Sequence, residues 1–153
     1  MESQQVAPVK SFEMGDLLRV MADENRAKTG EIARADDDKD PATVAYWISA
    51  SQVGSRDMLV FFRDQQNIVT ATFFPKLPAP PEVASLFLEI CNRWNVEENT
   101  LVAAMVPDQG VILKSAMQTG FPLPESALLL WVGVVLRKAV RFGQFFEQEV
   151  EKL

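Results

Sequence analysis

The residue types that most often perform chemistry in proteins are scarce in this chain. Histidine is absent from its 153 residues, and Cys91 is the single cysteine. The chain therefore has no histidine general base, no serine or cysteine nucleophile activated by histidine, and none of the commonest zinc ligand sets. Carboxylates or lysines could act only in a pocket that shifts their pKa values, and no such constellation stands out. We expect no catalytic residues and a protein that is not an enzyme.

A run of aspartates at positions 36, 37, 38 and 40 is a candidate metal site. Its oxygens could hold a hard cation, but the run lacks the glycine turn and the distal glutamate of a calcium-binding hand loop. Self-repulsion and turn preference favour a solvated acidic loop instead. Gly110 and Gly120 each stand alone, so the chain has neither a phosphate-binding loop nor a dinucleotide fingerprint. We expect no metal and no cofactor.

The spacing of apolar residues predicts which elements would position any functional residue. Residues 1–10 lack periodicity, so we expect a flexible N-terminal tail, followed by a single domain over residues 11–153. Helical spacing predicts a first helix from Phe12, which Gly30 would stop at the latest. β-branched and aromatic residues, separated by turn residues, predict five strands. These predicted strands are 44–50, 58–63, 68–74, 100–106 and 111–117.

Two further helices complete the predicted fold. Prolines at 78, 80 and 81 end the third strand and allow a helix over residues 82–94. A last helix over residues 125–150 carries apolar residues on one face. The order is helix, three strands, helix, two strands, helix. The predicted fold class is α+β, with an antiparallel sheet of about five strands and three helices.

The strand at residues 58–63 is apolar on both of its faces. Met58, Val60 and Phe62 would face one way, and Leu59 and Phe61 the other. Three helices can cover one face of a sheet, so a second subunit or a partner chain could close the other. Alternatively, loops or the N-terminal segment cover it. Met58, Val60 and Phe62 are therefore candidate contact residues.

The first half of the last helix is apolar nearly all round. Leu129, Trp131 and Val134 lie away from the stripe that contains Leu128 and Val132. A helix that is apolar on all sides must be buried somewhere, so we expect these three residues to contribute to a subunit contact in a homodimer. Trp131 would be a natural anchor of that contact.

Charge and chain ends bear on partners and location. Lys and Arg number 15 against 21 Asp and Glu, giving a net charge of −6 that disfavours nucleic acid as a partner. Residues 1–10 lack the features of a signal peptide, and the single cysteine suits a reducing compartment. The longest apolar stretch, residues 127–136, is shorter than the roughly 20 residues that a membrane span needs. We expect a cytoplasmic protein without a membrane span.

Three segments together carry a family resemblance. They are Asn92-Arg93-Trp94-Asn95 at the end of a predicted helix, the predicted hairpin over residues 100–117, and Ala139-Val140-Arg141-Phe142-Gly143-Gln144-Phe145 in the last helix. With them, the stretch 87–146 resembles the YbjN-like family, described as bacterial sensory-transduction regulators. That family is similar in fold to type III secretion chaperones, which are small acidic α+β proteins that dimerise and bind extended segments of partners. The resemblance implies no catalytic residues.

Two functions are compatible with these observations. The first is a dimeric interaction or regulatory module that holds a segment of an unidentified partner protein, in a chaperone-like or signalling role. The second is a small-ligand sensor with a pocket between sheet and helices. Trp94 bears on this choice: we expect its ring in the core, with Asn95 helping to end the helix. A ligand contact by Trp94 is the alternative.

Overall fold

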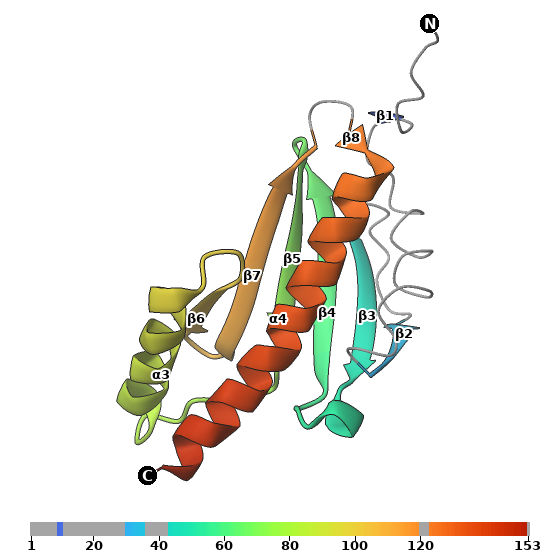
Figure 1. Ribbon diagram of the computed structural model, residues 1–153. Coiled ribbons are helices and arrows are strands. Elements are labelled where there is room, and N and C mark those ends of the chain that lie inside the picture. Colours follow the sequence, from blue (N-terminus) through green and yellow to red (C-terminus); the bar gives the residue numbers. More distant parts are fainter. Residues whose placement is uncertain (1–8, 11–29, 36–42, 120–122, 153) are drawn as a thin grey trace, which may run out of the picture.

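A six-stranded antiparallel sheet forms the body of the structure, with a long helix across one of its faces (Figure 1). The structure is a computed structural model, which describes residues 9–10, 30–35, 43–119 and 123–152. Neighbouring strands follow the order β2-β3-β4-β5-β7-β6. The strands of this sheet are β2 (Glu31–Ala35), β3 (Thr43–Ser49), β4 (Met58–Gln65), β5 (Ile68–Phe74), β6 (Val102–Val106) and β7 (Gly110–Gln118).

Two α-helices occur in the described part of the chain, and both lie on the same side of the sheet. Helix α4 (Glu125–Glu151) crosses it diagonally, and α3 (Ala84–Glu97) lies beside β6 at the edge (Figure 1). A short 3₁₀ helix, η1 (Ser51–Val53), connects β3 to β4. Two short strands, β1 (Val9–Lys10) and β8 (Leu123–Pro124), pair with each other in a second sheet.

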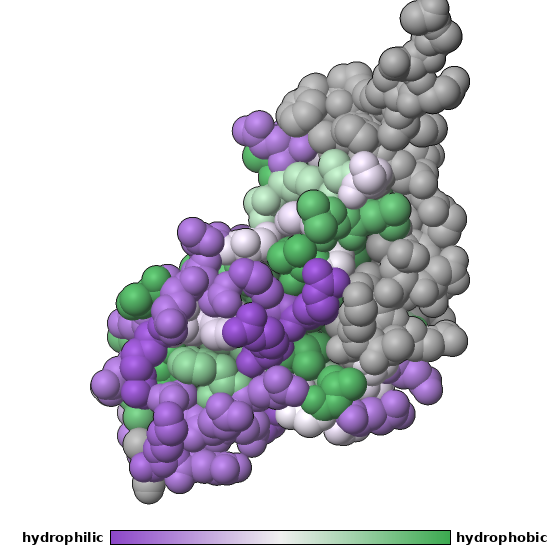
Figure 2. Space-filling model, in the orientation of Figure 1, coloured by the Kyte–Doolittle hydropathy of each residue, from purple (hydrophilic) through white to green (hydrophobic). Residues whose placement is uncertain are grey.

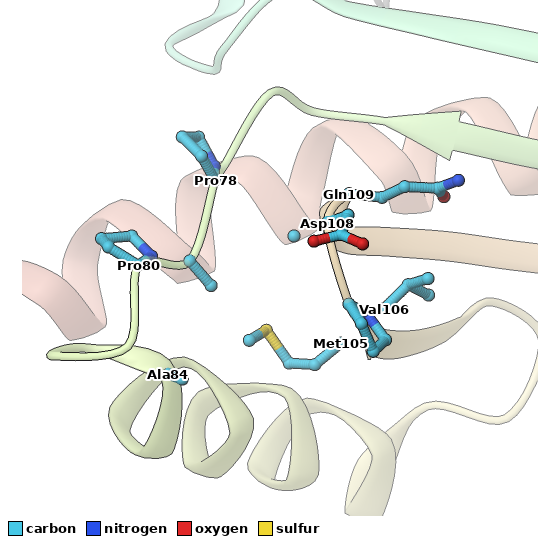
Figure 3. Close-up of a pocket in the computed structure, with 10 residues that line it drawn as sticks. Pro78, Pro80, Ala84, Met105, Val106, Asp108 and Gln109 are labelled. Atoms are coloured by element: carbon cyan, nitrogen blue, oxygen red, sulfur yellow. The ribbon is translucent and has the colours of Figure 1, made fainter.

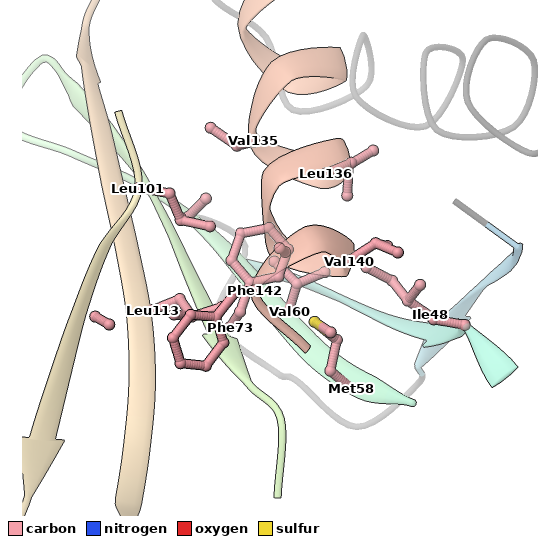
Figure 4. Close-up of a cluster of buried hydrophobic side chains, with 14 of the residues drawn as sticks. Ile48, Met58, Val60, Phe73, Leu101, Leu113, Val135, Leu136, Val140 and Phe142 are labelled. Carbon is pink, nitrogen blue, oxygen red and sulfur yellow. The ribbon is translucent and has the colours of Figure 1, made fainter. Parts of the chain in front are cut away.

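The core fills the space between α4 and the sheet (Figure 4). Helical spacing places Val135, Leu136 and Phe142 on the face of α4 that packs on the strands, and all three are fully buried. Every second side chain of β4 and β5 is buried against these residues, because successive side chains of a strand point to opposite faces of the sheet. Each large side chain buried in this way contributes about 1.5 to 3 kcal/mol of hydrophobic free energy.

The turn between β6 and β7 brings a distant segment of the chain close to the sheet. Gly110 has a φ of 81°, in the left-handed region, and the Val111 N–H donates a hydrogen bond of 3.2 Å to the Leu77 carbonyl oxygen. A Cβ added at Gly110 would lie 2.3 Å from that same oxygen. Glycine is therefore required here by both backbone conformation and space.

The predicted arrangement of five strands and three helices, with its type III secretion chaperone-like fold, is wrong. The chain is α+β and its main sheet is antiparallel, but this sheet has six strands, and the described residues form two α-helices. The missed strand is β2, whose short sequence with two alanines gives a weak strand signal, and long-range pairing with β3 overrides it. The helix predicted from Phe12 and the aspartate run at 36–40 lie outside the described residues.

Candidate functional site

The two faces of the sheet differ in what covers them. One face packs against α4 and α3, whereas none of the described helices lies on the opposite face (Figure 1). Residues paired across antiparallel strands point to the same face, so the register identifies the side chains on this second face. We call it the open face, and its central side chains are Trp47, Leu59, Phe61, Arg63, Thr70, Thr72, Phe74 and Lys114.

Aromatic side chains dominate the centre of the open face. The rings of Phe61 and Phe74 meet edge to face, with centroids 5.6 Å apart. Lys76 places its Nζ 4.3 Å from the centroid of the Trp47 ring. All three aromatic residues remain partly exposed. Such rings supply large contact area at low entropic cost, which is why they are enriched at protein interfaces.

A shallow hollow lies on this face beside the two phenylalanine rings. Its volume is about 480 Å³, and two of its lining residues are basic while none is acidic. The lining residues are Thr43, Phe61, Arg63, Gln65, Thr70, Thr72, Phe74 and Lys114. Arg63 and Lys114 are both exposed. The hollow thus combines an aromatic floor with positive charge, in a chain whose net charge is −6.

Met58, Val60 and Phe62, expected as contact residues, lie on the other face of β4. Each has 0% of its surface exposed, because α4 packs over them. They are core residues of this chain and offer no surface to a partner. Strand β4 is apolar on both faces, as its sequence indicates, but its partly exposed apolar residues are Leu59 and Phe61.

The other three expected contact residues, Leu129, Trp131 and Val134, are partly buried on α4. The Trp131 ring packs edge-on against Phe62 at 6.0 Å, and its indole N–H donates to Ser115 Oγ at 3.3 Å. Its neighbour Leu130 is more accessible, at 66% exposed. Figure 2 shows hydrophobic surface gathered over this N-terminal half of α4.

Trp94 and Asn95 both form side-chain hydrogen bonds to the backbone of the edge strand β6 or of the residue just before it. The Trp94 ring is buried and meets Phe142 edge to face at 5.2 Å, and its indole N–H donates to the Leu101 carbonyl oxygen at 2.9 Å. The Asn95 side chain donates to the Ala103 carbonyl oxygen at 2.8 Å and accepts from the Ala103 N–H at 2.9 Å. The core position expected for Trp94 is confirmed. Asn95 bonds to a strand, where a role in ending the helix was expected.

A larger hollow, of about 620 Å³, opens between the chain before α3 and the turn after β6 (Figure 3). Its walls are mostly apolar, with Pro78, Pro80 and Met105 among them, and Asp108 is its one charged lining residue. A sensor pocket needs several polar groups that converge on a ligand. This hollow therefore gives little support to the small-ligand alternative.

Several titratable groups in the described part of the chain are buried or paired within the fold. Burial raises the pKa of the Cys91 thiol to about 11, so this thiol stays protonated and unreactive near neutral pH. Arg93 on α3 pairs with Glu149 on α4 at 2.8 Å, and Glu98, directly after α3, pairs with Lys138 on α4. No group of three or more possible metal ligands occurs among the described residues.

Comparison of the sequence with models of known protein families and with curated proteins finds no match. The YbjN-like resemblance therefore stays a prediction. Its segments do meet in the structure, where Trp94 contacts both Phe142 and Phe145. None of the helices in the described ranges is long and apolar enough to cross a membrane.

Proposed function

We propose that this chain is a non-enzymatic protein-interaction module that holds a segment of a partner protein on its open face. One observation carries the proposal: Trp47, Phe61 and Phe74 are partly exposed on a sheet face that no described helix covers, while the opposite face is filled by α4. Aromatic anchors at the centre of a patch are the residues that most often dominate binding energy. The YbjN-like resemblance adds support for a regulatory role in a bacterial cytoplasm.

The same proposal includes a homodimer formed through the N-terminal half of α4. Residues 126–136 carry no charge, and Leu130 is 66% exposed in the middle of them. Burying this helix face against its copy would remove an apolar patch from water without desolvating a charge. The open face remains available to the partner segment in such a dimer, because α4 lies on the opposite side of the sheet (Figure 1).

Affinity capture with matched variants tests the partner site. We expect the unmodified chain to retain one specific protein from cells of its source, and Phe61→Ser to lose it. Leu88→Ser is the control, since Leu88 is 48% exposed on α3, away from the open face. All three proteins need the same melting temperature within a few degrees. Equal capture by Phe61→Ser, or none by the unmodified chain, would overturn the proposal.

Light scattering tests the dimer. We expect twice the chain mass at micromolar concentration, reduced to the chain mass in Leu130→Glu, because a buried unpaired carboxylate is costly. Leu88→Glu places the same charge on α3 and should remain dimeric. A monomeric mass for the unmodified chain would remove the α4 contact from the proposal and leave the open face untouched.

A further inference from the structure

We infer that the segment held by the open face is acidic as well as apolar, so that its carboxylates meet Lys114 while its apolar side chains cover Phe61 and Phe74. This inference rests on the proposed function and names its class of partner. It starts from the hollow on the open face, whose lining contains two aromatic rings and two cations but no acid.

The register fixes how the charges flank the rings. Phe61 pairs with Thr72, and Thr72 pairs with Lys114, so these three side chains form one row across β4, β5 and β7. Neighbouring strands lie about 4.8 Å apart, which puts the Lys114 backbone about 10 Å from that of Phe61. Arg63 lies two residues beyond Phe61 on the same face of β4. Arg63 already takes part in an interaction within this chain, so Lys114 is the cation that a segment seated on the rings would meet.

Lys114 is the cation most open to a partner. It is exposed, and it has no ion-pair partner among the residues that the structure describes. A carboxylate placed against it would form a charge-assisted hydrogen bond, and the partly desolvated edge of an interface strengthens such a bond. A lysine or arginine in the same place would be repelled. The hollow therefore selects against basic segments.

Two other occupants fit this chemistry less well. A second copy docked face to face would set Lys114 and Arg63 of each copy against the same patch of the other, because a twofold contact is self-complementary. A single strand of nucleic acid could stack on the rings, but the net charge of −6 opposes its approach. An acidic, apolar protein segment is complementary both to the rings and to Lys114.

Fluorescence anisotropy with two synthetic peptides tests the inference. One labelled peptide of about ten residues alternates phenylalanine or leucine with glutamate, and the second replaces each glutamate by lysine. We expect the full-length chain to bind the acidic peptide at least about fivefold more tightly than the basic one. Raising the salt from about 50 mM to about 300 mM should reduce that preference, because partly exposed pairs are screened.

Variants locate the effect. We expect Lys114→Glu to weaken binding of the acidic peptide about fivefold or more, and Phe61→Ser to remove it. Arg141→Glu is the charge-matched control, because Arg141 is 65% exposed on α4, on the other side of the sheet, and its binding should equal that of the unmodified chain.

Each other outcome overturns the inference. If both peptides bind equally, or Lys114→Glu has no effect, the acidic preference is wrong, while loss of the captured partner in Phe61→Ser would still support the interaction module. If neither peptide binds, the inference also fails. A single-stranded RNA that displaces the acidic peptide and binds more tightly would overturn both the acidic partner and the protein-binding function. A Phe61-dependent dimer would assign the open face to a second copy.

Discussion

The side-chain amide of Asn95 lies against the backbone of Ala103 as a neighbouring strand would. Asn95 donates to the Ala103 carbonyl oxygen at 2.8 Å and accepts from its N–H at 2.9 Å. The preceding residue, Trp94, donates its indole N–H to the carbonyl oxygen of Leu101, which lies two residues before Ala103, at 2.9 Å. Strand β6 is an outer strand of the main sheet, at the opposite edge from β2, and unpaired backbone groups at a sheet edge allow pairing with another chain. Helix α3 thus blocks edge-to-edge association at this position.

Replacing Asn95 by alanine should both destabilise the fold and open this edge. The change leaves the N–H and the carbonyl oxygen of Ala103 without their partners, at a cost of about 1 to 3 kcal/mol in the free energy of unfolding. Urea unfolding measures the cost, and light scattering over time measures association through β6. Asn92→Ala is the control, since Asn92 is exposed on the same helix and should change stability by less than about 0.5 kcal/mol. Identical unfolding curves for the two variants would contradict the proposal that Asn95 satisfies the backbone groups of Ala103 at this sheet edge.

Trp94 should matter for folding before it matters for binding. Its ring is 4% exposed and packs against Phe142, so Trp94→Ala deletes a large buried aromatic group and should cost roughly 3 to 5 kcal/mol. Trp94→Phe keeps a ring but loses the hydrogen bond to Leu101, and its cost should be smaller. Chemical unfolding followed by circular dichroism gives both values. A Trp94→Ala protein that keeps its melting temperature but loses a partner would show that the ring is a contact residue.

The fold was only partly predictable, because some elements have a clear local sequence signal and others depend on pairing with a strand elsewhere in the chain. β4 and β5 are rich in β-branched and aromatic residues, so their sequences predict strands correctly. Strand β2 exists only through its pairing with β3, and its sequence of Glu, Ile, Ala, Arg and Ala does not distinguish a strand from a helix. The prediction of which face of α4 is buried was correct, since the apolar spacing of this helix persists over several turns.

The open face could not be predicted because both faces of β4 are apolar. Alternation separates Met58, Val60 and Phe62 from Leu59 and Phe61, but it does not say which set α4 covers. Arg63 and Lys114 are far apart in the sequence and line one hollow only because β5 lies between their strands. A usable signal was present: in strands that are otherwise apolar, a charged residue marks the face that stays in contact with water.

Substituting Gly110 should be far more damaging than substituting Gly54. Both have a left-handed backbone, with φ values of 81° and 78°, so alanine at either site carries a strain of about 1 to 2 kcal/mol. At Gly110 the new Cβ would also lie 2.3 Å from the Leu77 carbonyl oxygen, whereas at Gly54 the nearest atom is 3.6 Å away. We expect Gly110→Ala to cost at least about 2 kcal/mol more than Gly54→Ala by urea unfolding. Equal losses would mean that the segment at Leu77 can move away without penalty.

The buried thiol of Cys91 should make stability fall in alkaline solution. Burial raises the pKa of Cys91 to about 11, above the value of about 8.5 for an unfolded thiol. The part of the free energy of unfolding that depends on the protonated thiol is therefore fully present below about pH 8.5. It is lost as the pH rises toward 11, because the thiol of the unfolded chain releases its proton first. At about pH 10 the loss should be roughly 1 to 2 kcal/mol relative to pH 7. Other groups contribute to the pH dependence of both proteins, so the quantity to compare is the change in urea midpoint between the unmodified chain and Cys91→Ala. We expect the alanine variant to be less stable at pH 7 and to lose less stability on raising the pH.

The same burial predicts that a thiol reagent reacts slowly with the folded chain at neutral pH and rapidly once urea unfolds it. Fast labelling of the folded protein, together with parallel pH profiles for the two chains, would place the thiol outside the core.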